Sequence, residues 1–196
     1  MMRAFVAVEM SEPIREALSA LIAEMRRLDA PVKWVEAQNI HLTLKFLGAV
    51  PDAAVARATE ILRGCTSGIA PFSIEIAGAG GFPDLKRPRV IFVCAADQPP
   101  VAAELARRLN EQMAEVGAER DDRPYQNHIT LGRVRPSRAS GSSDEPRHLA
   151  RLTQRLESLQ GKSFGSMQVA EVTLMESKLP PAGPIYSPVE RVRLAG

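Results

Sequence analysis

Hydrophobic positions recur with two periods along the chain, and these periods predict strands and helices in a regular order. Residues 3–10 form an apolar, β-branched run that is typical of a buried strand. Ser11 and Pro13 then mark a helix start, and apolar residues recur at helical spacing to about residue 28. The same reasoning predicts strands over 32–35, 41–48 and 72–78, and a helix over about 51–63.

The pattern begins again in the second half of the chain. Strands are predicted over 89–96, 128–134 and 167–177, and helices over about 100–116 and 148–159. One offset of 87 residues carries Phe5 onto Phe92 and His41 onto His128. This agreement predicts a single domain over residues 1–196 with an internal duplication of approximately 1–80 and 88–178. Two such copies are expected to pack about an approximate two-fold axis.

Composition and charge limit the classes of function. With 45% hydrophobic and 24% charged residues among 196, the chain has the composition of a folded globular protein. A formal net charge of +2 is too small for tight nonspecific binding of nucleic acid, so a phosphate partner must be held locally. No apolar run approaches the length of a membrane span, and we expect a cytoplasmic monomer without membrane contact. Cys65 and Cys94 are isolated and are expected to be buried free thiols.

Two irregular stretches interrupt the predicted elements. Residues 78–89 contain glycines, prolines and the cations Lys86, Arg87 and Arg89, which indicates a mobile basic connector. Residues 135–147 are rich in serine and glycine, which indicates a flexible loop after the strand over 128–134.

The candidate chemistry lies in a repeated phrase, "HLTLKFLG" from residue 41 and "HITLGRV" from residue 128. Because side chains alternate along a strand, His41 and Thr43 share one face with Lys45, while Leu42, Leu44 and Phe46 share the other. His128 and Thr130 likewise share a face. Each strand therefore presents an imidazole beside a hydroxyl, with an apolar face to bury.

Two imidazoles near neutral pH suit a displacement at phosphorus. One deprotonates the attacking oxygen and the other protonates the leaving oxygen, while the threonine hydroxyls donate hydrogen bonds to the phosphoryl oxygens. No metal or cofactor is needed. The other histidine, His148, lies in a predicted surface region, so a zinc site with three protein ligands is not expected. No complete P-loop is present, and the one G-x-S-x-G match, "GKSFG" at residues 161–165, follows a predicted helix and precedes a predicted strand, which is the reverse of the strand-to-helix turn of a nucleophile elbow.

The two motifs, with "RAFVAV", "RPRVIFV" and "VTLMESKLPPAGPIY", resemble the two-histidine phosphoesterase superfamily, and within it the RNA 2′,3′-cyclic phosphodiesterases also called 2′-5′ RNA ligases. The resemblance implies an α+β, bilobal fold with two lobes related by a pseudo-two-fold axis. Each lobe has an antiparallel-rich sheet with flanking helices, and the active-site cleft lies between them. It also implies that RNA 2′,3′-cyclic phosphate ends are opened to 2′-phosphates, with His41 as proton donor, His128 as proton acceptor, and Thr43 and Thr130 on the phosphate.

The resemblance also raises questions about neighbouring residues. Arg133 occupies the place of a phosphate-binding cation, but simple alternation turns it away from His128, so it reaches the phosphate only if the strand bulges; a surface salt bridge is the alternative. Asn127 stands where relatives commonly have proline, which leaves the backbone entering the motif open. For Phe46 core packing is favoured over stacking on a base, and for Trp34 both roles stay open.

Three functions are consistent with the sequence. The leading one is metal-independent cyclic phosphodiesterase activity on RNA ends, with reversible 2′-5′ ligation as an addition. The alternatives are a noncatalytic protein that binds RNA ends or nucleotides, and a phosphodiesterase for a small cyclic phosphate such as an ADP-ribose derivative.

Overall fold

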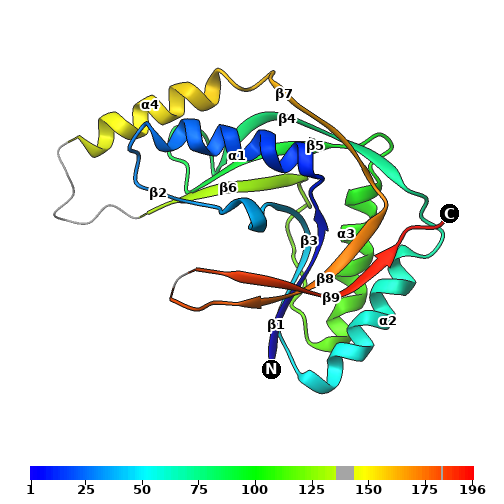
Figure 1. The fold of residues 1–196 in the computed structure, drawn as a ribbon. Helices are drawn as coiled ribbons and strands as arrows, with labels where there is room; N and C mark the ends of the chain where they lie inside the picture. The colour runs from blue at the N-terminus through cyan, green and yellow to red at the C-terminus, as the bar shows by residue number, and fades with distance from the viewer. Residues whose placement is uncertain (136–143, 182) are drawn as a thin grey trace.

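The computed structural model describes residues 1–135, 144–181 and 183–196, in which helices and strands alternate along the chain (Figure 1). The helices are α1 (Glu12–Arg26), α2 (Val55–Thr66), α3 (Val101–Gln112) and α4 (Glu145–Glu157). The strands are β1 (Met2–Glu9), β2 (Val32–Trp34), β3 (His41–Val50), β4 (Phe72–Phe82), β5 (Val90–Ala96), β6 (His128–Val134), β7 (Ser163–Val169), β8 (Glu171–Lys178) and β9 (Ile185–Arg193). Short 3₁₀ turns occupy Ala37–Asn39, Asp52–Ala54 and Met113–Val116.

The strands form one curled antiparallel sheet in two halves. Its order is β7-β4-β5-β6-β3-β1-β8-β9, and β2 pairs with β6. We name β3, β1, β8 and β9 the first half-sheet, and β6, β5, β4 and β7 the second half-sheet. They join where β3 meets β6, through the antiparallel residue pair Leu42–Ile129. The predicted α+β fold with two antiparallel lobes is confirmed.

The helices cover the half-sheets in a crossed arrangement. Helices α2 and α3 lie together on one side of the molecule, and α1 and α4 lie together on the other (Figure 1). Although α1 follows β1 of the first half-sheet, it packs on β7 of the second. Conversely, α3 follows β5 of the second half-sheet and packs on β3 of the first. Each lobe therefore combines segments from both halves of the chain.

The core confirms the helical and strand periods that the sequence predicts. Helix α1 buries the stripe of Ile14, Leu18, Leu21, Ile22 and Met25. On β3 and β6, the apolar residues Leu42, Leu44, Ile129 and Leu131 are 0–3% exposed. Burial of this face leaves the opposite face of both strands for polar side chains.

The structure corrects several predicted boundaries. The strand predicted over 167–177 is two strands, because the chain leaves β4 at Val169 and joins β1 through β8. Strand β4 extends to Phe82 and so includes the start of the predicted connector 78–89. Helix α4 begins at Glu145 instead of 148, and most of the predicted flexible loop 135–147 lies outside the described residues. Strand β9 was not predicted.

Two further observations concern the remaining expectations. Cys65 is buried as predicted, whereas the prediction for Cys94 is wrong because this thiol is exposed on β5. Among the helices of the described residues, none is both long and apolar enough to span a membrane.

Candidate functional site

The residue pair that joins the half-sheets brings the two H-x-T motifs side by side. Leu42 on β3 pairs with Ile129 on β6 in antiparallel orientation. Because neighbours along a strand point to opposite faces, His41 lies across from Thr130, and Thr43 lies across from His128. All four side chains share the face that the helices leave uncovered. Diagonal neighbours on paired strands lie about 7–8 Å apart, which is close enough for both imidazoles to reach one phosphate.

Both imidazoles are oriented by the same local hydrogen bond. Nδ1 of His41 lies 2.7 Å from the carbonyl oxygen of Asn39, and Nδ1 of His128 lies 2.9 Å from that of Gln126. A carbonyl accepts only, so Nδ1 carries the proton in each ring and donates it. Nε2 of each ring is therefore free for proton transfer: it accepts a proton in the neutral form and donates one in the charged form.

Each histidine also packs against two aromatic rings. The His41 ring lies 4.9 Å from Phe5 and 5.3 Å from Tyr186 between centroids. The His128 ring lies 5.0 Å from Phe82 and 5.4 Å from Phe92. These contacts restrict both rings to one orientation and reduce their contact with water.

Burial changes the protonation of His41. It lowers the pKa of this imidazole below its ordinary value, and a charge on His128 lowers the pKa further, while the hydrogen bond to the Asn39 carbonyl raises it. The interaction between the two rings shows that they lie within electrostatic reach of each other.

A β-bulge follows each motif at the same place. Ala7 pairs with Thr43 and Val6 with Lys45, so Leu44 has no partner on β1. Phe92 pairs with Thr130 and Ile91 with Gly132, so Leu131 has no partner on β5. An unpaired residue shifts the alternation of all later side chains by one position. The fifth residue after each histidine therefore returns to the histidine's face.

In the first motif the bulge reverses two predictions. Phe46 was expected in the core, but it pairs with Phe5 on the His41 face and is 60% exposed. Lys45 was expected beside His41, but it is 3% exposed on the opposite face. There its ammonium donates to the carbonyl of Glu119 and to the carboxylate of Asp121, both at 2.7 Å. Phe46 thus presents an open aromatic ring beside the catalytic candidates.

In the second motif the bulge determines which face of β6 carries Arg133. This residue pairs with Val90, which shares a face with Phe92, the partner of Thr130. Arg133 therefore lies on the face of Thr130 and His128. Burial raises the pKa of Tyr186 and the Arg133 charge lowers it, so the guanidinium is near a ring that contacts His41. No ion pair of Arg133 occurs among the described residues, and its contact with the phosphate stays a prediction.

The loop before the second motif is hydrogen-bonded to the backbone of the first motif. The hydroxyl of Tyr125 donates to the carbonyl of Thr43 at 2.9 Å, next to the Leu44 bulge. Burial raises the pKa of Tyr125, and Asp97 raises it further, so the phenol stays a donor. Asn127, where proline was expected from the resemblance, donates to the buried carboxylate of Asp97 at 2.8 Å. These contacts fix the backbone that enters the His128 strand.

Comparison with known proteins identifies the family of this chain. The model of the LigT-like phosphoesterases matches residues 8–92 and 94–186. The chain belongs to this family. It is similar to proteins named RNA 2′,3′-cyclic phosphodiesterase, with 38% identity to that of Methanothermobacter thermautotrophicus (98% of each chain covered) and 34% to that of Archaeoglobus fulgidus (94% of this chain and 96% of the relative).

Solved structures show the same fold. TT0787 of Thermus thermophilus aligns over 98% of each chain with a TM-score of 0.78 and 28% identity. E. coli LigT in complex with 3′-AMP aligns over 100% of this chain and 99% of its own, with a TM-score of 0.75 and 27% identity. The similarity to both extends across the two half-sheets.

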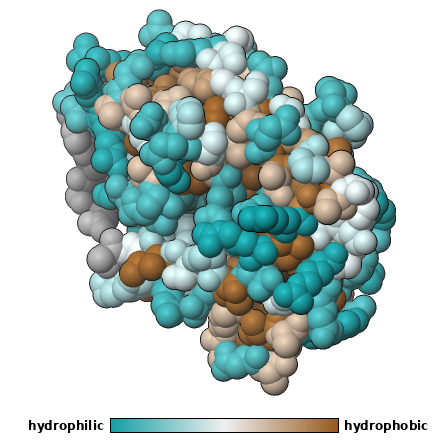
Figure 2. Space-filling model, turned by 45° about the vertical axis from the view of Figure 1, so that its right-hand side comes forward, coloured by the Kyte–Doolittle hydropathy of each residue, from teal (hydrophilic) through white to brown (hydrophobic). Residues whose placement is uncertain are grey.

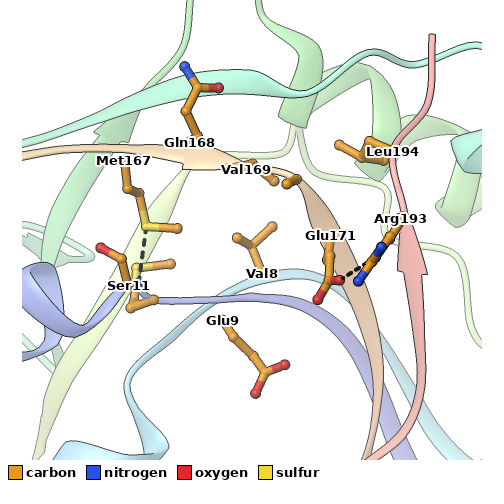
Figure 3. A pocket seen from close by; sticks show the side chains of 11 residues that line it. Val8, Glu9, Ser11, Met167, Gln168, Val169, Glu171, Arg193 and Leu194 are labelled. Atoms are coloured by element: carbon orange, nitrogen blue, oxygen red, sulfur yellow. Dashed lines mark hydrogen bonds and ion pairs between the residues drawn. The ribbon is translucent and has the colours of Figure 1, made fainter.

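A cavity elsewhere in this LigT-like phosphoesterase does not belong to the motif face. It has a volume of about 540 Å³ and lies between the end of β1 and the crossing from β7 to β8. Figure 3 shows Met167 opposite Ser11 and the ion pair of Glu171 with Arg193 among its lining side chains. None of the motif histidines or threonines lines it. Within the described residues, no group of three or more His, Cys, Asp or Glu side chains is placed to hold a metal ion.

Two site residues were missed because their elements were missed. Tyr186 lies on β9, an edge strand that was not predicted, and Phe82 lies at the end of β4, inside the predicted connector. The β-branched residues Ile185, Val189 and Val192 were the available signal, but Pro188 weakened it. Trp34, for which both roles were open, packs against the core.

Proposed function

We propose that this chain hydrolyses RNA 2′,3′-cyclic phosphate ends to 2′-phosphates through His41 and His128, without a metal. Membership of the LigT-like phosphoesterases and the names of the relatives support cyclic phosphodiesterase activity. The observation that carries the mechanism is the matched orientation of the two imidazoles, each with Nδ1 on a backbone carbonyl and Nε2 free.

In the proposed reaction the neutral His128 takes a proton from water as the water oxygen bonds to phosphorus. The bond from phosphorus to the ribose 3′ oxygen breaks, and the charged His41 protonates that oxygen. The product is a 2′-phosphate with a free 3′ hydroxyl. Each step transfers one proton, so the pair ends in the reverse protonation state and exchanges it through solvent.

The reaction also requires groups that stabilise the negative charge that develops on the phosphoryl oxygens. The hydroxyls of Thr43 and Thr130 lie on the same face as the imidazoles and are suited to donate hydrogen bonds to the non-bridging oxygens. Arg133 adds a fixed cation with a planar fork of donors that matches a phosphate. The exposed ring of Phe46 provides a surface on which a base can stack.

The function is tested with the purified protein in EDTA. A short RNA ending in a 2′,3′-cyclic phosphate is expected to yield the 2′-phosphate at an unchanged rate after metal removal. Three further substrates are run in parallel. A nucleoside 2′,3′-cyclic phosphate and an ADP-ribose cyclic phosphate test for small-molecule activity, and an RNA with a 5′ hydroxyl tests for ligation. Formation of the 3′-phosphate isomer, or loss of activity in EDTA, would contradict the mechanism.

The pH dependence tests which histidine is the acid. Burial against Phe5 and Tyr186 disfavours the imidazolium of His41 and lowers its pKa. Replacing Tyr186 by alanine admits water, so this pKa should rise toward its ordinary value of about 6.5. A donor must be protonated, so the alkaline limb of kcat/KM is expected to move to higher pH.

The matched control for this experiment is Phe82→Ala. Phe82 contacts His128 and not His41 among the ring contacts of the described residues, so the limb assigned to His41 should stay in place. If Tyr186→Ala shifts the acid limb in place of the alkaline limb, His41 is the base and the two roles are reversed.

A further inference from the structure

Three cations form a row that extends from the motif face. Lys33 on β2 lies directly opposite Arg133 on β6, and the Arg135 amide donates to the Pro31 carbonyl at 2.7 Å, which continues the same pairing. Alternation places Lys33, Arg133 and Arg135 on one face. All three are exposed. We name them the cation row.

Among the described residues, no carboxylate neutralises the cation row. Within the described residues no ion pair involves any of its three members. Several cations on the helices are paired, as in Arg26–Glu36, Arg63–Glu190 and Arg107–Glu111. Like charges directly opposite each other on paired strands destabilise a sheet. The arrangement therefore lowers stability unless an anion lies across the row.

The cation row begins next to the candidate site. Arg133, its inner member, lies near Tyr186, whose ring contacts His41. Because Val90 pairs with Arg133, the residues before Val90 lie beyond Arg133 in the direction of Arg135. Lys86 and Arg87 belong to that loop, and both are exposed. Positive charge thus continues outward from the catalytic face. Figure 2 shows one face of the molecule, on which hydrophilic and hydrophobic residues are interspersed.

We propose that the cation row binds the phosphates of the RNA strand upstream of its 2′,3′-cyclic end. This inference rests on the proposed function, since an RNA end at His41 and His128 has one strand to place. Arg133 and Arg135 are two residues apart along one extended segment, about 6.5–7 Å, so they can contact successive backbone groups, while Lys33 lies beside Arg133 on the neighbouring strand. Such contacts add affinity without reading the base sequence.

The test measures RNA binding separately from turnover. A fluorescent RNA decamer with a 2′-phosphate end is titrated with the protein at increasing salt, and binding is followed by anisotropy. The variant Lys33→Ala/Arg135→Ala should bind at least about tenfold more weakly at low salt. The slope of log K against log salt should fall by about 0.7 for each cation removed. A nucleoside 2′-phosphate, which spans only the catalytic face, should keep its affinity within about twofold.

Two controls separate this role from a structural one. Arg120→Ala removes an exposed cation that has no ion pair in the described residues and lies beside Asp121, on the Lys45 side of β3; it should leave decamer binding unchanged. Lys33→Ala should not lower Tm, because it removes a repulsion. An unchanged salt slope in the double variant, or an equal loss of mononucleotide binding, would contradict the proposal that the cation row binds RNA phosphates. Absence of turnover by the wild type would instead contradict the proposed function. The binding data would still show whether the cation row binds RNA.

Discussion

Replacement of His41 or His128 by alanine is expected to lower kcat for hydrolysis of a 2′,3′-cyclic phosphate by about 10²–10⁴ for each variant. The reason is that each imidazole performs one of the two proton transfers in the proposed reaction. The double variant should lose little more than either single variant, because the two groups act as a unit. Steady-state rates and a urea unfolding curve for each variant check that activity is lost and the fold is kept.

A substrate with a better leaving group separates the two roles. An aryl phosphodiester releases a phenolate that needs no proton, so the variant that lacks the acid should regain activity on it. By the assignment above, His41→Ala should regain activity and His128→Ala should not. The matched control is His148→Ala, which removes the third histidine, on α4, and should keep wild-type rates. Wild-type turnover of the cyclic phosphate by either motif variant contradicts the mechanism.

The sequence predicted the part of the site that depends on local alternation. Within each H-x-T-L phrase the period of two holds, so the polar pair and the buried pair fall on the expected faces. The match of Phe5 to Phe92 under one offset also has a counterpart in the structure, since each ring contacts the histidine of its own half of the chain. These features require only the local geometry of a strand and its nearest partner.

The bulges could not be predicted, because a bulge is a property of two paired strands. Leu44 and Leu131 are unremarkable apolar residues, and what makes them bulges is the register of β1 and β5 against them. Beyond that point the sequence period gives the wrong face, which explains the errors at Lys45 and Phe46. The crossed packing of α1 and α3 was hidden for a similar reason, since amphipathic stripes indicate burial but not the surface that they meet.

The edge strand β9 was missed because its sequence combines strand and turn signals. Pro188 has no N–H to donate, which argues against a central strand but is compatible with an edge strand such as β9. The consequence is specific: Tyr186 reaches His41 from the far edge of the first half-sheet, although its sequence position is remote from both motifs.

Replacement of Arg133 by alanine is expected to lower kcat by about 10²–10³, the range observed when one preorganised donor to a developing oxyanion is removed. The bulge at Leu131 places this side chain on the face of Thr130, and in the proposed reaction its charge acts where negative charge develops on the phosphoryl oxygens. Lysine at this position keeps the charge but loses the planar fork, so Arg133→Lys should recover only part of the rate. Single-turnover rates at saturating substrate measure this effect without the contribution of binding.

The alternative for Arg133 is that it only holds substrate through the cation row. In that case Arg133→Ala would raise KM for RNA, leave the single-turnover rate unchanged and resemble Lys33→Ala. Under the proposed role the rate falls equally for RNA and for a nucleoside 2′,3′-cyclic phosphate, because both carry the reacting phosphorus. The mononucleotide therefore decides between the two roles: a wild-type rate on it removes Arg133 from the transition state, whereas a large loss places the guanidinium on the phosphoryl group itself.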